Sequence, residues 1–201
     1  MIISIVRDVE RTEIKTVADS LLRGGIHRVE VSLSDEEKGF ASLYKLCQNY
    51  RDEMEIGVGT VTSIEQADKA IEIGAKYIIT PGWDKTLVEA CLQKGYRVIP
   101  GVFTPGEIMQ AQMIGIHQVK LFPASSLGEQ YIRNIKGPFP KVSIMGVGGI
   151  TLKNVRDYQD AGCDSFAIGS DLVPRGATKR DQDHIEKRAK AYERALKGEA
   201  E

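Results

Sequence analysis

The chain has 201 residues and a formal net charge of −1, with 42% hydrophobic and 27% charged residues. This length suits one domain with a substantial core, so we expect a single globular domain over residues 1–201. A near-neutral charge gives no electrostatic reason to bind nucleic acid or an anionic membrane. No apolar run is as long as a membrane span, and the N-terminal "IISIV" is too short for a signal peptide. We therefore expect a cytoplasmic protein with neither nucleic acid nor membrane as a partner.

The cysteines and histidines are scattered along the chain. The cysteines form no C-x-x-C pair, which is typical of reduced, buried thiols rather than of disulfides or zinc ligands. The histidines show none of the short spacings typical of metal ligands. We therefore predict no metal site and no cofactor. The residues concerned are Cys47, Cys91, Cys163, His27, His117 and His184.

Short β-branched segments alternate with longer amphipathic ones, and Gly, Pro, Ser, Thr or Asp marks each change. The predicted strands, in chain order, are 2–6, 28–33, 54–59, 76–80, 96–101, 118–122, 142–146 and 165–170. Helical periodicity with start and stop residues lies between several of them. The predicted helices are 16–25, ending at Gly24–Gly25; 62–75, beginning at Thr62 or Ser63; 104–115, with Thr104 as N-cap and Pro105 next; 151–162, capped by Thr151; and about 178–198.

Eight strand–helix units in succession favour a parallel sheet with helical crossovers. Eight is also the number of units that closes a (β/α)8 barrel. We therefore predict an α/β protein with a compact (β/α)8 TIM barrel, and a doubly wound open sheet is the alternative.

Two ionisable residues lie at inward positions of the predicted barrel. Alternate strand residues point into a barrel and toward its helices, and the helix-facing set must be apolar. On strand 118–122 Val119 and Leu121 occupy the helix-facing parity, so Lys120 points inward, together with Gln118 and Phe122. The same argument on strand 28–33 places Glu30 inward. Arg7 and Thr60 end their strands at the face where barrel enzymes build their active sites.

A buried lysine suits nucleophilic chemistry because burial lowers its pKa and favours the neutral amine. A carboxyl such as that of Glu30 could then move protons for it. The alternative is a buried ion pair that only closes the bottom of the barrel, although such pairs contribute little to stability.

Two glycine-rich strand ends predict an anion site. "GVGGI" follows the seventh strand and "IGS" follows the eighth, where many barrels bind phosphate with backbone N–H groups. The candidates are Gly148, Gly149, Gly169 and Ser170. Tight turns without a ligand are the alternative.

Taken together, these motifs resemble the 2-keto-3-deoxy-6-phosphogluconate (KDPG) and 4-hydroxy-2-oxoglutarate (KHG) aldolases. The resemblance covers nearly the whole chain and keeps the order of the family's motifs. It is carried by "ISIVR", "GGIHRVEVSL", "GVGTVTSIEQADKAIEIGAKYIITPG", "VIPGVFTPGEIMQAQMIGIHQVKLFPA", "VGGITLKNVRDYQDAG" and "IGSDLV".

The resemblance implies a metal-free class I aldolase, a homotrimer, that cleaves a 2-keto-3-deoxy sugar-acid phosphate or 4-hydroxy-2-oxoglutarate to pyruvate and an aldehyde such as glyceraldehyde 3-phosphate. It implies that Lys120 forms the imine with pyruvate and that Glu30 moves protons. The other implied roles are carboxylate binding by Arg7 and Thr60, backbone contacts near Pro81 and Pro100, packing of Phe122 on the pyruvate unit, and phosphate binding by Gly148, Gly149, Gly169 and Ser170.

Two positions depart from the family pattern, which reads P-T-G-G before the seventh helix and often has arginine shortly after the catalytic glutamate. Val147 removes a hydroxyl in the first motif, and Ser34 replaces the arginine in the second. Arg28 and Arg133 are candidates to supply the missing cation. Both departures concern the identity of the substrate more than the type of reaction.

Two further functions remain open from the sequence. One is an isomerase or epimerase with a phosphate-binding barrel, in which Glu30 is the base and Lys120 stabilises charge. The other is a sugar-phosphate binder that has no activity.

Overall fold

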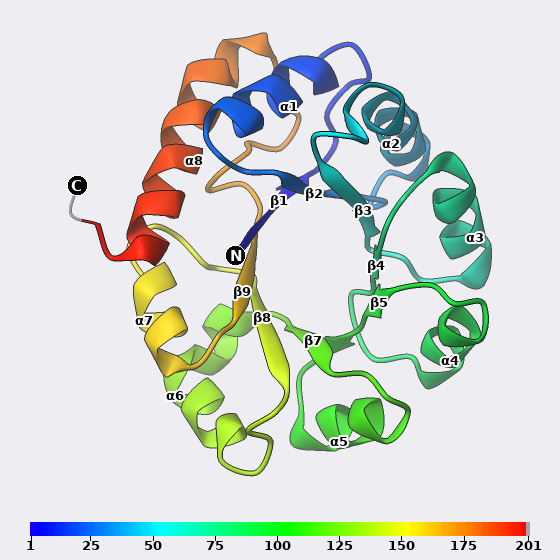
Figure 1. The fold of residues 1–201 in the computed structure, drawn as a ribbon, viewed down its shortest axis with the longest axis vertical. Coiled ribbons are helices and arrows are strands. Elements are labelled where there is room, and N and C mark those ends of the chain that lie inside the picture. The colour runs from blue at the N-terminus through cyan, green and yellow to red at the C-terminus, as the bar shows by residue number, and fades with distance from the viewer. Residues whose placement is uncertain (200–201) are drawn as a thin grey trace.

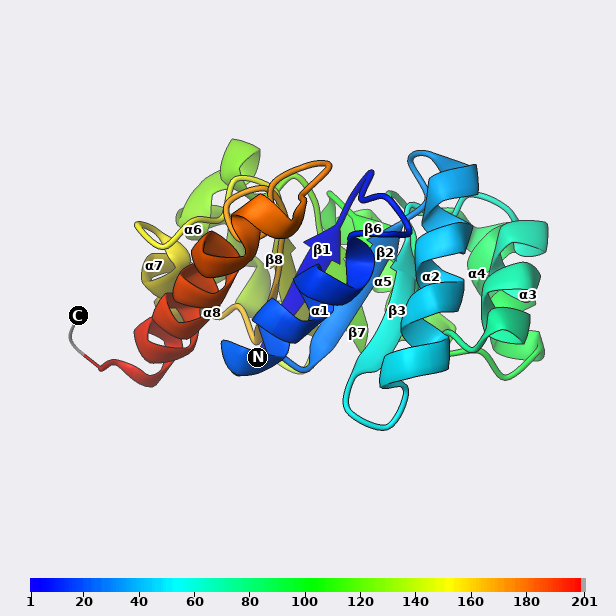
Figure 2. The same ribbon diagram turned by 90° about the horizontal axis from the view of Figure 1, so that it is seen from above.

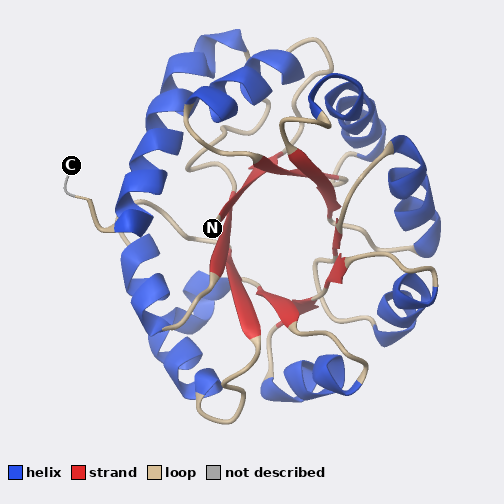
Figure 3. Cartoon of the chain, viewed as in Figure 1, coloured by secondary structure: helices blue, strands red, loops and turns tan. Residues whose placement is uncertain are grey.

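Nine parallel strands form a nearly closed ring in the computed structural model, which describes residues 1–199, and helices surround the ring (Figures 1 and 3). Paired strands follow the order β5-β4-β3-β2-β1-β9-β8-β7-β6. This arrangement confirms the predicted α/β barrel. The strands are β1 (Ile2–Val6), β2 (Arg28–Ser32), β3 (Glu55–Gly59), β4 (Ile78–Ile79), β5 (Val98–Ile99), β6 (Gly101–Val102), β7 (Gln118–Leu121), β8 (Ser143–Val147) and β9 (Ser165–Ile168).

Eight α-helices form the outer layer of the described chain, and none of them is both long enough and apolar enough to cross a bilayer. Three of them, α2, α4 and α6, occupy crossovers for which we predicted no helix range. The helices are α1 (Ile14–Arg23), α2 (Glu36–Tyr50), α3 (Ile64–Ile73), α4 (Lys85–Gln93), α5 (Pro105–Met113), α6 (Ala124–Lys136), α7 (Val155–Ala161) and α8 (Gln182–Lys197), with a 3-10 turn η1 (Lys179–Asp181) before α8.

The ring closes through the predicted fifth strand, which is broken into two short pieces. β5 pairs with β4, whereas β6 pairs with β7, so the chain passes from one partner to the other at Pro100. The carbonyl of Pro100 still accepts a hydrogen bond of 2.8 Å from the backbone N–H of Lys120. The prediction of one continuous strand over 96–101 was therefore wrong, because proline at the turning point donates no ladder hydrogen bond.

The helix start signals were right at Ser63, which caps α3, and at Thr104, but wrong at Thr151. Thr104 caps α5 in a complete capping box with Glu107. Thr151 does not cap α7, which begins four residues later at Val155. The N–H of Thr151 instead donates to the side chain of Asn154 at 2.8 Å, which holds residues 151–154 in a turn ahead of the helix.

The first and last helices close the outer layer side by side (Figure 2). Arg23 of α1 forms an ion pair of 2.7 Å with Glu186 of α8. Gly24, which we predicted only as a stop residue, also permits close packing, because an added Cβ would lie 2.2 Å from Ala189 Cβ. α8 is thereby held against the barrel along the side where β9 returns to β1.

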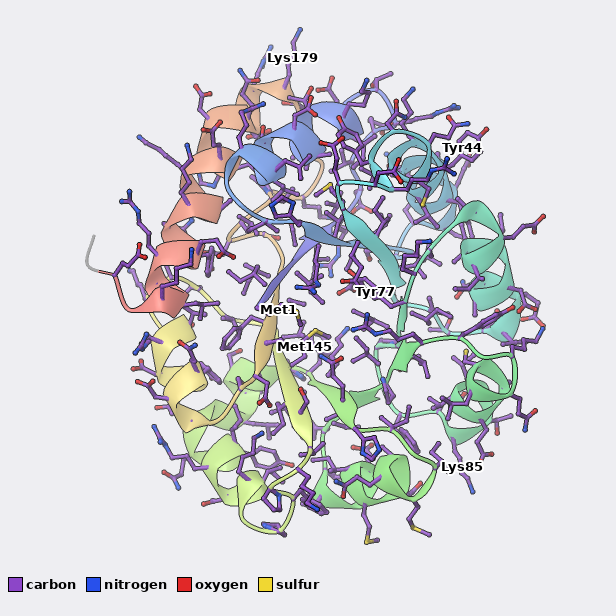
Figure 4. All side chains as sticks on the ribbon, viewed as in Figure 1. Met1, Tyr44, Tyr77, Lys85, Met145 and Lys179 are labelled. Atoms are coloured by element: carbon purple, nitrogen blue, oxygen red, sulfur yellow. The ribbon has the colours of Figure 1, made fainter. Side chains whose placement is uncertain are left out.

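Apolar residues fill the part of the barrel interior below Lys120 and Glu30, and Gly57 on β3 makes room for one of them. Figure 4 shows Tyr77 and Met145 inside the ring, where both are buried. A Cβ added to Gly57 would lie 2.1 Å from the Tyr77 ring. The hydroxyl of Tyr77 donates to the carbonyl of Val29 at 2.8 Å. The interior is therefore a packed core below the polar residues of the site.

Charged residues close the opposite end of the barrel, where the strands begin. Glu55 pairs with Arg28 at 2.6 Å and with Arg97 at 2.5 Å. Burial alone would raise the pKa of Glu55, but the two arginines hold it below its ordinary value. The barrel bottom is therefore closed by these three residues and not by Lys120 with Glu30. Arg28 lies at this end, so it was a wrong candidate for the missing cation.

Candidate active site

Lys120 and Glu30 lie inside the barrel, as their strand parity predicted. Only 5% of Lys120 and 2% of Glu30 is exposed, whereas the neighbouring residues Val119 and Val31 pack toward the helices. No ion pair within 4.0 Å joins the lysine to the glutamate in the described chain, and Glu30 Oε2 is buried without a hydrogen-bond partner. The two groups therefore share one interior space without neutralising each other through direct contact.

Burial shifts both groups toward their neutral forms. It lowers the pKa of Lys120, and Arg7 lowers it further, while Glu30 opposes the shift. Burial likewise raises the pKa of Glu30, against the opposing effect of Lys120 and Arg7. A neutral amine is a nucleophile and a protonated carboxyl is an acid, so both shifts are in the direction that carbonyl addition requires.

Gly59 gives the carboxyl of Glu30 its position. A Cβ added to this glycine would lie only 1.7 Å from Glu30 Oε1. Gly59 faces Ser32 on β2, two residues beyond Glu30. The "GVG" of β3 therefore makes room for Tyr77 with its first glycine and for Glu30 with its second.

Arg7 and Thr60 lie directly beyond β1 and β3. Arg7 is half-buried, and its Nε has no hydrogen-bond partner in the described chain. Thr60 has a φ of 61°, a left-handed conformation that is costly for a β-branched residue. Its hydroxyl lies 3.1 Å from that of Ser32, which in turn donates to Ser34 at 3.2 Å. Where the family pattern has arginine, this chain therefore has a row of hydroxyl groups beside Thr60.

The backbone near Pro81 and Pro100 is joined by Thr80, a residue that we did not predict. Its hydroxyl donates to the carbonyl of Gly82 at 2.7 Å and accepts from the N–H of Gly101 at 3.0 Å. A Cβ on Gly101 would lie 2.6 Å from the carbonyl carbon and oxygen of Pro81. The two proline segments are thus held against each other at the point where β5 and β6 separate.

A cavity of about 360 Å³ opens at the carboxyl ends of β7, β8, β9 and β1. Phe122, with 41% of its surface exposed, lines the cavity, and its ring centre lies 5.0 Å from Lys120 Nζ. The cavity brings together six of the predicted site residues: Arg7, Phe122, Gly148, Gly149, Gly169 and Ser170. Lys120, Glu30, Thr60, Pro81 and Pro100 do not line this cavity.

The two glycine turns line this cavity. Gly148 and Gly149 have φ values of 91° and 74°, which only glycine adopts without strain. The N–H groups of Gly149, Ile150 and Ser170 donate no hydrogen bond within residues 1–199. Free N–H groups in glycine turns and at helix N-termini are typical of sites that bind anions, so the two turns are the candidate phosphate site.

Further cavity residues were not predicted as site residues. They are Ile5, Val147, Ile150, Thr151, Ala167 and Asp171, of which Val147 was noted only as a departure. Inward parity on β8 could have identified Val147. Neither arginine considered as a replacement cation lines the cavity. Arg133 on α6 donates to the carbonyl of Asp160 at 3.1 Å instead.

Comparison with known proteins identifies the family of this chain. The family model for KDPG and KHG aldolase matches residues 1–188. The 2-dehydro-3-deoxy-6-phosphogalactonate aldolase of Escherichia coli (strain K12) is 30% identical over 197 residues, which cover 97% of this chain and 96% of that protein. The 2-dehydro-3-deoxy-phosphogluconate aldolase of Haemophilus influenzae is 35% identical over 147 residues, which cover 73% of this chain and 68% of that protein.

Solved structures agree with this assignment. KDPG aldolase from Legionella pneumophila, captured with pyruvate as a covalent carbinolamine intermediate, superposes with a TM-score of 0.86 at 30% identity, covering 94% of this chain and 92% of that one. A cube-shaped protein cage designed by fusing symmetric oligomeric domains superposes with a TM-score of 0.88 at 29% identity, covering 98% of this chain and 72% of that one. The resemblance inferred from the motifs is confirmed, and the chain belongs to the KDPG and KHG aldolase family.

Proposed function

We propose that this protein is a class I aldolase that cleaves a 2-keto-3-deoxy sugar-acid phosphate, or a related 4-hydroxy-2-oxo acid, to pyruvate and an aldehyde. The observation that carries the proposal is the buried amine of Lys120, whose pKa is lowered by burial and by Arg7, in one interior space with the unpartnered carboxyl of Glu30. Membership of the family and the carbinolamine of pyruvate in a relative support it.

The proposed reaction begins when neutral Lys120 attacks the C2 carbonyl of the substrate. Loss of water, with a proton supplied by Glu30, gives a protonated imine. Glu30 as carboxylate then takes the proton of the C4 hydroxyl, the C3–C4 bond breaks, and its electron pair forms the enamine as the aldehyde leaves. Return of the proton to C3 and addition of water release pyruvate and regenerate the amine. Glu30 acts alternately as acid and base, which its raised pKa favours.

The two ends of the substrate are assigned to different parts of the barrel mouth. Arg7 and Thr60 would hold the carboxylate, with the backbone near Pro81 and Pro100, and Phe122 would pack on the pyruvate unit. The free N–H groups of the two glycine turns support a phosphate site formed by Gly148, Gly149, Gly169 and Ser170.

Measured turnover of a small panel tests the substrate class. Release of pyruvate would be followed with the phosphorylated gluconate and galactonate epimers, their unphosphorylated forms, and 4-hydroxy-2-oxoglutarate. We expect turnover of at least one phosphorylated epimer and its loss in Lys120→Met. Substantial turnover in Lys120→Met, or a Lys120→Arg variant with near-normal turnover, would contradict the imine mechanism.

We also propose a homotrimer that is assembled through the outer face of α5. Met109 and Met113 on this face are 54% and 78% exposed, and Phe103 just before the helix is 42% exposed. The only charged side chain of α5 is that of Glu107, which is occupied in the capping box. An uncharged helix face with large exposed apolar residues is typical of a protein interface. The match to a symmetric oligomeric domain supports a second copy as the partner.

Light scattering tests the assembly. We expect a mass three times that of one chain, and a smaller mass when lysine replaces both Met109 and Met113. Lysine at Gln182, which is exposed on α8, is the matched control and should leave the mass unchanged. A wild-type monomer, or a double variant of unchanged mass, would contradict this interface.

Two further properties remain proposals. The whole chain, residues 1–201, would act as one domain, although residues 200 and 201 lie outside the described part. A cytoplasmic location is supported by the three free, buried cysteines Cys47, Cys91 and Cys163. Fractionation of cells that express the protein would test the location.

A further inference from the structure

The loop between β9 and α8 carries one half of the proposed anion site, and it includes an aspartate, Asp171, directly after Ser170. Gly169, Ser170 and Asp171 all line the cavity. A bare carboxylate next to a phosphate site would repel the ligand, so the partners of Asp171 decide what this loop can bind.

Two residues of α8, Arg188 and Tyr192, form hydrogen bonds with Asp171. Arg188 Nε donates to the backbone carbonyl of Asp171 at 2.9 Å, and its Nη2 forms an ion pair with Asp171 Oδ2. The hydroxyl of Tyr192 donates to the same oxygen. Tyr192 is fully buried, and the Arg188 side chain is only 28% exposed. One guanidinium therefore fixes both the main chain and the side chain of Asp171 and also neutralises its charge.

The two halves of the anion site are held in different ways. The Gly148–Gly149 turn is held by its own positive φ values and by close contacts, since a Cβ on Gly149 would lie 2.1 Å from Ser125 Oγ. A Cβ on Gly169, by contrast, would meet no atom within 4 Å. The loop after β9 is thus open on its cavity side at Gly169. Leu172 and Val173 anchor the loop in the core, and their N–H groups donate to the carbonyl of Gly169 at 2.9 and 3.0 Å. The tether to α8 adds a hold on Asp171, between Ser170 and this anchor.

The far end of the same loop is fixed independently of α8. The N–H of Gly176 donates to the carbonyl of Arg7 at 3.0 Å, and Arg175 forms an ion pair with Asp8. Loss of the tether should therefore release the side chain and carbonyl of Asp171 next to Ser170, while the core anchor at Leu172 and the surroundings of Arg7 stay in place.

We infer that Arg188 and Tyr192 are positioning residues for the phosphate end of the substrate, acting through Asp171. The inference rests on the proposed function and deepens it: the docking of the last helix sets the preference for phosphorylated over unphosphorylated substrates. Neither residue touches the reacting carbons, so neither contributes to imine formation.

The experiment separates the two ends of the substrate with two probes. Exchange of the methyl protons of pyruvate with deuterium reports on Lys120 and Glu30 without any phosphate. The inhibition constant of inorganic phosphate, and the KM of the phosphorylated substrate, report on the anion site. The variants are Arg188→Ala, Arg188→Lys and Tyr192→Phe, the last two being mild enough to keep the fold. Arg194→Ala is the matched control, because Arg194 is exposed on α8 and its side chain has no hydrogen bond or ion pair within residues 1–199.

We expect Arg188→Ala to raise both phosphate-dependent constants about tenfold or more, as is typical when a partner of a buried charged group is removed, with smaller increases for the mild variants. Pyruvate exchange and kcat should stay near wild type. Because the bare carboxylate of Asp171 would repel phosphate, Asp171→Asn added to Arg188→Ala should restore part of the affinity, which a double-mutant cycle measures.

Unchanged phosphate constants in Arg188→Ala and Tyr192→Phe would overturn the inference. A loss of pyruvate exchange as large as the loss of phosphate affinity would also overturn it, because it would indicate general damage to the fold. If the wild type exchanges no pyruvate, the proposed function fails instead, while the phosphate affinities of the variants, measured by calorimetry, still test the tether.

Discussion

Gly59→Ala places a methyl group where the carboxyl of Glu30 now lies. The added Cβ would be 1.7 Å from Oε1 and 2.4 Å from Cδ of Glu30. The backbone of Gly59 is outside the left-handed region, so alanine adds no conformational strain there. The whole effect of the substitution therefore falls on the position of one carboxyl group.

The expected cost to stability is about 1–3 kcal/mol, the usual range for an extra carbon in a packed interior. The cost to activity is larger. A displacement of about 1 Å at a reacting group costs roughly 10²-fold, and loss of general acid–base catalysis costs roughly 10²–10⁴-fold. We therefore expect kcat to fall by a factor of roughly 10²–10⁴, while Lys120 remains in place.

Deuterium exchange of pyruvate, followed by NMR, and urea unfolding measure the two effects separately. Gly57→Ala is the matched control. Gly57 lies two residues earlier on the same strand and faces the same side, but its added Cβ would lie 2.1 Å from the ring of Tyr77 instead of beside the carboxyl of Glu30. The control should lose comparable or greater stability and much less exchange. Near-normal exchange in Gly59→Ala, or equal losses in the two variants, would refute the proposed role of Glu30.

The remaining predictions concern charge and substrate choice. The pKa of Glu30 is raised in the folded chain and that of Lys120 is lowered. At neutral pH the unfolded chain favours the charged form of both groups, so each group lowers the free energy of unfolding. The double variant Glu30→Gln/Lys120→Met should therefore be inactive but more stable by about 1–4 kcal/mol in urea unfolding, and lower stability would contradict this account. The rate of imine formation should rise with pH through the lowered pKa of Lys120. Removal of the neighbouring cation in Arg7→Gln should move this rise to higher pH, and an unmoved or acid-shifted profile would count against the pairing. Val147→Thr restores a hydroxyl at the cavity wall. It should raise the ratio of the kcat/KM values for the two sugar-acid epimers about 3–10-fold, the effect of a single hydrogen bond. An unchanged ratio would place this residue away from the substrate.

Strand parity was sufficient to place the reacting pair. The period of two on strands 28–33 and 118–122 left Glu30 and Lys120 as inward residues, because the helix-facing positions had to be apolar. The family resemblance gave the same two residues, and the strand ends placed Arg7 and the glycine turns at one face of the barrel.

Features that depend on contacts across the barrel could not be predicted. The break of the fifth strand at Pro100 follows from its pairing with two different strands, and the late start of α7 follows from a turn held by Asn154. The need for Gly59 appears only once the carboxyl of Glu30 is seen beside it. Asp171 was not predicted, because its partners lie 17 and 21 residues away on a helix whose docking the local sequence does not specify.

Reductive trapping of pyruvate tests the central claim most directly. The protein would be incubated with pyruvate and borohydride, digested, and examined by mass spectrometry. We predict that one residue, Lys120, gains the mass of reduced pyruvate, and that Lys120→Met gains none. An unmodified Lys120 under saturating pyruvate, or modification of another lysine in its place, would contradict the assignment.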